Sequence, residues 1–490
     1  MRGVALFCVA AFAGGCTLGP NYQRPQIEAP TAYRYAEPAA QAIADVEWWE
    51  GFGDPVLSDL VRDALRKNLD VRIAAARVDI FLGTLATTRS ALFPQVAISP
   101  AFPVQAARQR GSRIATPQKI PLDATVEYAT YQAGLSASWE IDLWGKVRRQ
   151  TDGATADVFA NEEARRGVVL SVAAATASGY IALRDLDRQL DIARETARSR
   201  GDSLELFQKR FAGGVVSQLE VSQVTSEFES ALSTIPGIER DIAVQEQALS
   251  LLMGRNPGPI PRGRSIDQLK PIVIPAGLPS ELLERRPDVR QAEQQLISAN
   301  AQIGAAKALY FPSISLTGVF GAVSTALGDL FTGPARTWTF AAGLTAPIFN
   351  AGALAGQVQQ AEAGQRLALA NYSKTVQAAF GDVENALITA SMARATQAAL
   401  QRTVAALADY ARLARLRYDN GYTSYIEVLD AERSLFEAQL SYAHSQNTTL
   451  AAQVAIYKAM GGGWIDAADR LTPVGAAAPL DKRVADQPMF

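Results

Sequence analysis

The sequence has few of the side chains from which metal centres and catalytic triads are built. It contains one histidine, His444, and two cysteines, Cys8 and Cys16. A zinc site of the Cys/His type needs several such ligands, and a histidine-based triad needs its histidine beside a nucleophile. No nucleophile, metal or phosphate-loop motif stands out either. We therefore expect no enzymatic activity, no metal and no cofactor, and we expect His444 to be incidental.

Neither charge nor aromatic side chains are in excess. The 47 basic and 49 acidic side chains nearly cancel. This balance argues against a nucleic-acid-binding protein, which usually carries a basic excess. Aromatic residues make up 8% of the chain, although hydrophobic residues make up 48%, mostly the Ala, Leu and Val of close-packed helices. At 490 residues we expect two units or one elongated architecture instead of a single compact core.

The N-terminus has the pattern of an export signal. Arg2 precedes an apolar run over residues 4–13, which is too short to span a bilayer but suits a signal peptide. The small residues 13–15 and Cys16 after them resemble a bacterial lipobox, in which the cysteine is acylated. We predict a lipoprotein signal peptide over residues 1–15 and a covalent lipid on Cys16, the one bound group that we expect. The alternative is ordinary cleavage that leaves Cys16 unmodified.

The residue after this cysteine is Thr17. In many Gram-negative bacteria an aspartate at this place retains a lipoprotein at the inner membrane, so the resemblance implies sorting to the outer membrane. Stable anchoring needs more than one acyl chain.

Self-comparison shows that the chain is two copies of one unit. Asp70-Val71-Arg72 returns as Asp288-Val289-Arg290, and Met253-Gly254 returns as Met460-Gly461, in the same order. This conserved order indicates tandem duplication. We predict an N-terminal segment 16–56, a first repeat 57–254, a proline-rich linker 255–287, a second repeat 288–461 and a C-terminal segment 462–490.

Each copy contains one very long helical stretch. Residues 122–235 and 348–472 lack proline, and residues 145–210 and 350–417 within them are rich in Ala, Leu, Arg, Glu and Gln. At 1.5 Å per residue, each stretch would be about 100 Å long. Ordinary globular domains do not need such rods, so we predict a mainly helical, elongated protein.

Four short segments instead alternate apolar and neutral polar residues and carry no charge: 94–105, 128–139, 312–321 and 337–348. This pattern is typical of transmembrane β-strands, and the alternative is a soluble β-sandwich. Membrane strands cannot leave an open edge in lipid, and single-chain barrels begin at about eight strands. Four strands cannot close, so we predict a homo-oligomer whose chains share one barrel.

Several motifs together resemble one known family. They are Cys16 with Gly19–Pro25, Trp48-Trp49, Arg286–Arg290 and Tyr418–Arg433. The chain is similar to the outer-membrane factors of tripartite efflux systems, TolC-like channels, in the lipoprotein subfamily that includes NodT and OprM. The resemblance implies a trimer with a twelve-stranded β-barrel in the outer membrane and a long α-helical barrel in the periplasm. It implies a passive exit duct, whose partners are a periplasmic adaptor and an inner-membrane RND-type pump.

The resemblance also places functional residues at the two turns between long helices. Gly213, Gly214, Ser217, Gly421 and Ser424 would form periplasmic tips that contact the adaptor. The carboxylates of the pore constriction would be Glu220, Glu427 and Asp430, each forming a ring of three in a trimer. The alternative for these carboxylates is a solvated helix face, or charges that complement the helix dipole.

One position departs from the family pattern. Thr423 stands where some relatives use an arginine to lock the tips, so the closed state would instead depend on packing of Tyr418, Tyr422 and Tyr425.

Other functions stay open from the sequence. The duct could serve type I protein secretion, or the chain could be a non-conducting lipoprotein tether across the envelope. A basic loop, Arg108 to Lys119, would face the outside, where it could contact anionic polysaccharide or simply be solvated.

Overall fold

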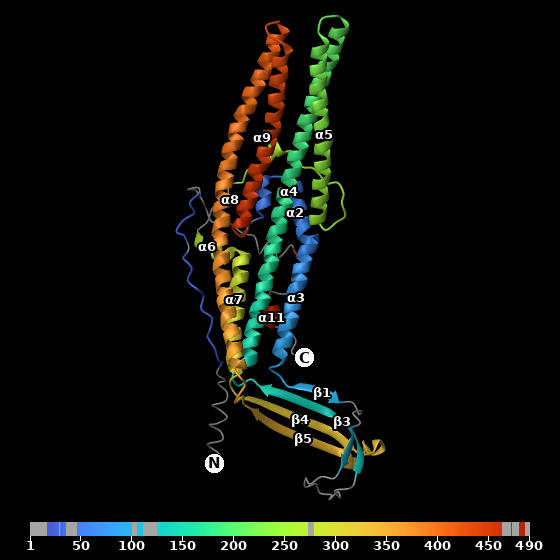
Figure 1. The fold of residues 1–490 in the computed structure, drawn as a ribbon, viewed down its shortest axis with the longest axis vertical. Coiled ribbons are helices and arrows are strands. Elements are labelled where there is room, and N and C mark those ends of the chain that lie inside the picture. Colours follow the sequence, from blue (N-terminus) through green and yellow to red (C-terminus); the bar gives the residue numbers. More distant parts are fainter. Residues whose placement is uncertain are drawn as a thin grey trace.

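The computed structural model shows an elongated protein with a β-sheet at one end and two helical hairpins reaching to the other (Figure 1). It describes residues 17–28, 30–35, 47–99, 105–110, 125–272, 279–462, 472 and 480–485. The predicted signal peptide and Cys16 lie outside these residues.

The two repeats have the same order of elements. The first contains α2 (Pro55–Lys67), α3 (Leu69–Ser90), β1 (Gln95–Ser99), β2 (Gln105–Arg110), β3 (Thr125–Ile141), α4 (Lys146–Ala212) and α5 (Gln218–Leu252). The second contains α6 (Pro279–Arg285), α7 (Pro287–Ala308), β4 (Ser313–Ser324), β5 (Arg336–Thr345), α8 (Ala353–Asp419) and α9 (Tyr425–Ala459). Short 3-10 helices are η1 (Trp48–Phe52), η2 (Ile266–Gln268), η3 (Leu327–Asp329) and η4 (Gly333–Ala335), and α11 (Leu480–Ala485) lies near the C-terminus.

The long helices match between the repeats. Both α4 and α8 have 67 residues, and both α5 and α9 have 35. At 1.5 Å per residue, 67 residues extend about 100 Å, as the proline-free stretches predict. One of the two longest helices, α4, contains an apolar stretch long enough to cross a membrane, but 56% of that stretch is buried inside the protein. Packing therefore accounts for its composition.

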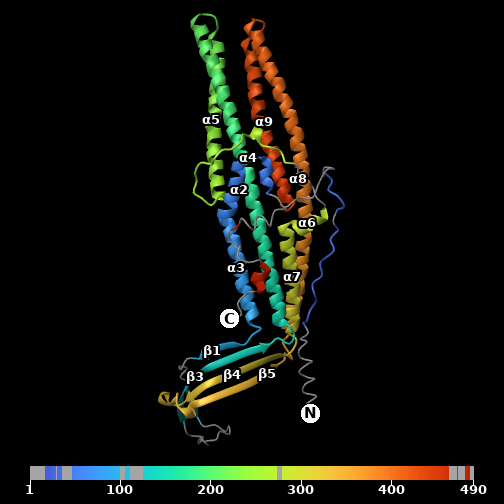
Figure 2. The same ribbon diagram turned by 180° about the vertical axis from the view of Figure 1, so that it is seen from behind.

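The helices form a single curved layer of four columns, visible from both sides in Figure 1 and Figure 2. Near the sheet the neighbours are α3, α4, α7 and α8 in that order, and toward the tips they are α5, α4, α9 and α8. The long helices α4 and α8 run the full length, whereas the other two columns are each made of two shorter helices. The sheet repeats this order, as β1-β3-β4-β5.

The sheet has one apolar and one small, polar face. In its antiparallel register Ile98, Leu135, Phe320 and Trp338 lie opposite one another across all four strands. These side chains are 76%, 47%, 66% and 76% exposed. The neighbouring row, on the other face, consists of Ala97, Ser136, Val319 and Thr339. One face is therefore suited to lipid, and the other to a water-filled interior.

The strands differ from the predicted segments. Within the predicted strand 94–105 the structure describes β1, which ends at Ser99, and the start of β2 at Gln105, whereas residues 100–104 lie outside the described part. Arg108 and Arg110 belong to β2 and pair in register with β3, so the predicted basic loop is wrong at its start. Its remainder, 111–119, lies outside the described residues.

Strand lengths also differ from those predicted. Both β3 and β4 extend beyond the uncharged segments, and β3 includes Glu127 and Glu140, whereas β5 begins at Arg336 and ends at Thr345. Absence of charge marks only the part of a strand at the depth of the hydrocarbon, so it misses strand ends that continue into water.

One side of the helical layer is covered near its middle by η1, α2 and the segment after α5. The main apolar core lies there and includes Trp49, Phe52, Leu57 and Tyr180. The buried carboxylate of Asp54 accepts hydrogen bonds from the hydroxyl of Tyr180 at 2.8 Å and from the backbone of Arg264 at 2.9 Å. Burial and the neighbouring Asp54 raise the pKa of Tyr180, so its hydroxyl stays a proton donor. Asp54, the residue that caps α2, therefore ties the linker after α5 to both α2 and α4.

The N-terminal segment is held at the boundary between sheet and helices. The buried guanidinium of Arg149 donates to the backbone oxygen of Leu18 at 3.0 Å and to the side-chain oxygen of Asn21 at 2.8 Å. Gly19 and Gly304 approach so closely that a Cβ on Gly19 would lie 2.4 Å from the Cα of Gly304. The chain is therefore fixed in place directly after position 16.

Candidate functional site at the helical tips

The two tip turns have the same backbone geometry. After α4, the backbone N–H of Val215 donates to the carbonyl of Arg210 at 2.9 Å, and after α8 the N–H of Tyr422 donates to Arg417 at 2.9 Å. This is the Schellman pattern, which needs a left-handed residue just before the donor. Gly214 and Gly421 fill that place, with φ of 75° and 77°. Gly213 has an ordinary helical φ of −83°.

The first predicted constriction carboxylate, Glu220, is used to cap its own helix. Its carboxylate accepts from the backbone N–H of Ser217 at 2.8 Å, and its own N–H donates to the Ser217 hydroxyl at 3.4 Å. This reciprocal pair is a capping box. Ser424 occupies the matching place before α9 without a side-chain cap bond. Sequence spacing alone could have identified this cap, since Ser and Glu stand three residues apart.

The second-repeat carboxylates differ in how freely they face solvent. Glu427 accepts from Arg417 Nη1 at 2.9 Å and from the hydroxyl of Thr423, and its side chain is 26% exposed. Asp430 pairs with Arg433 at 3.0 Å, one helical turn further on, and is 53% exposed. Thr423 therefore bonds within its own hairpin. Asp430 is the more available of the two carboxylates.

An aromatic cluster joins the two hairpins just behind the turns. Phe207 of α4 lies 4.3 Å from the ring of Tyr425 and 6.2 Å from that of Tyr418, and the two tyrosine rings are 4.9 Å apart. Arg210 donates to the Tyr418 hydroxyl at 3.2 Å. Tyr422, by contrast, is exposed. Two of the three tyrosines proposed from the sequence thus pack across the contact between repeats, and the third points to solvent.

Below this cluster lies a group of buried charges that the sequence did not suggest. Arg200 of α4 is almost fully buried, donates to the backbone oxygen of Glu227 at 2.7 Å, and lies over the ring of Phe436 at 5.5 Å. Burial raises the pKa of Glu432 on α9, against the lowering effects of Arg415 and Arg200. Polar positions in a coiled-coil seam could have indicated this group, but the partner of each charge depends on how the hairpins pack.

His444 is not isolated. Its Nδ1 lies 3.2 Å from a carboxylate oxygen of Asp185, a buried residue of α4, so it adds to the contact between α4 and α9. It also lines a cavity of about 620 Å³ between α8 and α9. Among the described residues, no group of three potential metal ligands is present.

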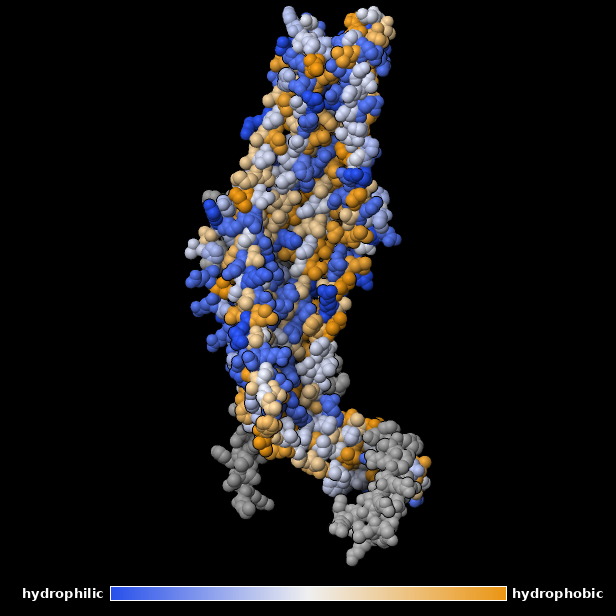
Figure 3. All heavy atoms as spheres, in the orientation of Figure 1, coloured by the Kyte–Doolittle hydropathy of each residue, from blue (hydrophilic) through white to orange (hydrophobic). Residues whose placement is uncertain are grey.

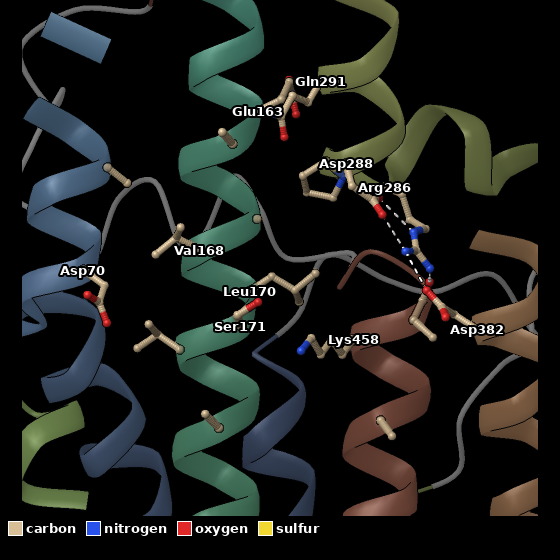
Figure 4. Close-up of a pocket in the computed structure, with 18 of the residues that line it drawn as sticks. Asp70, Glu163, Val168, Leu170, Ser171, Arg286, Asp288, Gln291, Asp382 and Lys458 are labelled. Atoms are coloured by element: carbon tan, nitrogen blue, oxygen red, sulfur yellow. Dashed lines mark hydrogen bonds and ion pairs between the residues drawn. The ribbon is translucent and has the colours of Figure 1, made fainter. Parts of the chain in front are cut away.

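A larger cavity lies at mid-height, where the stacked helices meet (Figure 4). Its volume is about 1060 Å³, and all the long columns contribute to its lining. Asp70, Glu163, Asp288, Asp382 and Lys458 give it a mixed charge. On α4, Gly167 and Ser171 line the cavity together with Leu170 and Val172, which also belong to the main core.

These features define a class of protein. Among the described residues, the edge strands of the membrane sheet are unpaired on their outer sides, and the sheet continues into long helices. These helices end in turns that contact each other through a small aromatic cluster and carry partly exposed charges. Such an arrangement suits a shared channel wall with an adjustable end.

Comparison with known proteins agrees with this class. The sequence pattern of the Outer membrane efflux protein family matches residues 60–255 and 278–462, which are the two repeats. The antibiotic efflux pump outer membrane protein ArpC of Pseudomonas putida is 35% identical over 478 residues, which are 94% of this chain and 96% of ArpC. The "Probable outer membrane lipoprotein SilC" of Salmonella typhimurium is 32% identical over 468 residues, 94% of this chain and 99% of SilC.

The fold is similar as well. The open-state crystal structure of the Neisseria gonorrhoeae MtrE outer membrane channel superposes with a TM-score of 0.81 at 31% identity, covering 92% of this chain and 99% of MtrE. The chain belongs to the outer membrane efflux protein family. The resemblance inferred from the motifs is confirmed, as are the mainly helical fold with a membrane sheet and the location in the outer membrane.

Proposed function

We propose that three copies of this chain form an exit duct through the outer membrane. The observation that carries this proposal is the sheet. Strands β1 and β5 have no partner on their outer edges among the described residues, although one face is apolar and exposed. Lipid tolerates no open edge. If β1 and β2, which both pair with β3, count as one strand position, each chain supplies four positions, and three chains make the twelve-stranded barrel that the family resemblance implies. The helical columns then continue the wall into the periplasm.

The cargo would be small molecules delivered by an RND-type pump in the inner membrane. Support comes from relatives over nearly the full length that are named as antibiotic and toluene efflux components. The duct itself would conduct passively, with no bond made or broken. The pump would therefore choose most of the cargo.

The tips would serve both docking and closure. A periplasmic adaptor would contact the two turns, which consist of Gly213, Gly214 and Ser217 in the first repeat, and Gly421 and Ser424 in the second. In a trimer, Asp430 would form a ring of three carboxylates able to attract cations and repel anions. Glu427 and Glu220 would contribute less, because local hydrogen bonds already hold them.

Lipid on Cys16 would add a second attachment to the membrane. The chain is held at Leu18 and Gly19 beside the sheet end, so the modified residue would lie near the membrane surface. Mass spectrometry of the mature protein should show acyl chains on Cys16. An unmodified cysteine would contradict the anchor but not the duct.

Conductance of purified trimers in planar bilayers tests the duct. We expect rare openings that prefer cations, and a weaker preference in Asp430→Asn. Glu220→Gln is the matched variant from the first repeat and should change selectivity less than Asp430→Asn, because the Glu220 carboxylate caps its own helix. Trimers that never conduct, even with Glu427 and Asp430 both neutralised, would favour a non-conducting tether. Export of a co-expressed protein substrate, without resistance to small molecules, would favour type I secretion.

A further inference from the structure

In each repeat, a short helix stacks end to end on the second helix of the hairpin, and one side chain bridges the junction. The α5 end meets the α3 start, and the α9 end meets the α7 start. The bridging residues are Asn68 and Arg286, each two residues before the repeated Asp-Val-Arg motif. The duplication has therefore kept the junction but changed the side chain that closes it.

The first junction depends on a neutral amide. Asn68 Nδ2 donates to the carbonyl of Leu252, the last residue of α5, at 2.8 Å. Its Oδ1 caps α3 by accepting from the backbone of Asp70 at 2.8 Å. Gly254 fits closely, since a Cβ there would lie 2.2 Å from the carbonyl oxygen of Lys67. Within the described part of the chain, Asn68 makes one hydrogen bond across this junction.

The second junction depends on a buried guanidinium. Arg286 Nη1 donates to the carbonyl of Ala459, the last residue of α9, at 3.0 Å. Its other nitrogens bind Asp288 of α7 at 2.6 and 2.9 Å, and Asp382 of α8 at 2.9 Å. Figure 4 shows Arg286 between these two carboxylates. One side chain thus joins three helices with charge-assisted bonds, which are about twice as strong as neutral ones.

Both junctions border the same cavity. Asp70 and Leu252 line it from the first junction, and Pro287 and Ala459 line it from the second. The bridging side chains therefore link the lower helices to the hairpins at the edge of this cavity.

We propose that Arg286 is a positioning residue for opening of the duct. It fixes the end of α9 to α7 and α8, so that the α8–α9 hairpin keeps a defined position on α4 and its tip cluster closes in register. The Asn68 junction, with one neutral bond, holds the α4–α5 hairpin less firmly. This inference rests on the proposed duct function.

The test compares Arg286→Gln with Asn68→Ser in reconstituted trimers. Glutamine removes the charge and most of the bonds, while serine keeps a helix-capping hydroxyl at the first junction but cannot bridge it. Arg286→Gln should raise the frequency of spontaneous openings about tenfold, the equivalent of one lost charge-assisted hydrogen bond. Asn68→Ser should raise it less, by about fivefold, since it loses one neutral bond. Equal effects of the two variants, or no effect of Arg286→Gln, would overturn the proposal.

A second readout does not require conduction. Hydrogen exchange at residues 459–462 should become faster in Arg286→Gln, because the end of α9 loses its link, while the heat stability of the trimer should change little. Asp288 and Asp382 are about half exposed and can be solvated when Arg286 is absent. Unchanged exchange would also overturn the inference. If wild-type trimers never conduct, but exchange at residues 459–462 is faster in Arg286→Gln than in wild type, the duct function is contradicted and the role of the Arg286 junction is not.

Arg286→Lys covers the case in which glutamine prevents assembly. Lysine keeps the charge but, as a single ammonium, cannot bridge three helices in the same way. If Arg286→Gln does not assemble, Arg286→Lys should still form trimers, and these should open more often than wild type. Wild-type opening in Arg286→Lys would show that charge and not position matters, and would overturn the proposal.

Discussion

Gly214 and Gly421 occupy the same place in the two tip turns, and both have the left-handed backbone that side chains with a Cβ disfavour. Nothing lies within 4 Å of a Cβ added at either position, so any cost there comes from backbone conformation and not from a clash. Gly213, beside Gly214, does not have this conformation.

Gly214→Ala and Gly421→Ala should therefore each destabilise the tip turn by about 1 kcal/mol. Hydrogen exchange of the turn amides is the measurement, because the change is local. Gly213→Ala is the matched control and should leave exchange nearly unchanged. Equal effects at Gly213 and Gly214 would contradict the assignment of the left-handed position.

We expect Glu432 to give the hairpin contact a pH dependence. Arg415 of α8, Arg200 of α4 and Glu227 of α5 act on it, but burial dominates and raises its pKa. A carboxyl whose pKa is raised by folding stabilises the contact when protonated, and this contribution is lost as pH rises through the raised pKa. Wild-type trimers should open less often at pH 5 than at pH 7.

Glu432→Gln should remove this dependence, since glutamine stays neutral at both pH values. Glu163→Gln is the control: the pKa of Glu163 is also raised by burial, but Glu163 lies at the mid-height cavity, so the tip should keep its response to pH. An identical pH profile in wild type and Glu432→Gln would assign the effect to another group.

Among the elements, the β-sheet shows best what alternation can and cannot predict. Trp338 and Thr339 are neighbours on β5 whose register places them on opposite faces. The period-two pattern identified these faces correctly, since side chains alternate along any strand. It could not predict that β1 and β2 pair with β3 in different registers, Ser99 opposite Gly134 and Gln105 opposite Thr130, because register depends on the partner strand.

Trp338→Arg should hinder assembly of the membrane sheet, at a cost of up to about 2–4 kcal/mol if the residue lies at the bilayer midplane. Thr339→Arg, on the other face, should be tolerated because water fills the interior. The yield of heat-resistant oligomer in outer membranes measures both. If Trp338→Arg gives a normal yield of heat-resistant oligomer and Thr339→Arg gives little, the lipid-facing and water-facing sides of the sheet are the reverse of those assigned.

The helices were the easier part to predict. Missing proline and high helix propensity sufficed for α4 and α8, because a long helix needs only local agreement along its sequence. The site residues were harder. Glycines and caps at the tips follow from local spacing, whereas Arg286 reaches Asp382 and Ala459, 96 and 173 residues away, and Arg200 reaches Glu227 across the turn between two helices. Such contacts leave no periodic signal in one sequence.

The whole molecule is incomplete as one chain. Apolar side chains are visible along the helical body and over the sheet in Figure 3. Several lie exposed on the outermost columns, including Leu69, Ile73 and Ile80 on α3 and Leu367 on α8. Because α3 and α8 continue from the two edge strands, copies of the same chain can cover both the strand edges and these helix faces together. In such an assembly, β1 and α3 of one copy would contact β5 and α8 of the next copy.

Disulfide cross-linking between the edge strands tests this account most directly. Each variant would carry one cysteine on β1 and one on β5, at positions scanned along both strands. The mature chain is expected to keep no free thiol of its own. Matched pairs of cysteines, one on each strand, should give covalent dimers and trimers in membranes and no larger species. Cross-linked species beyond the trimer, or no cross-link at any register along the two strands, would contradict it.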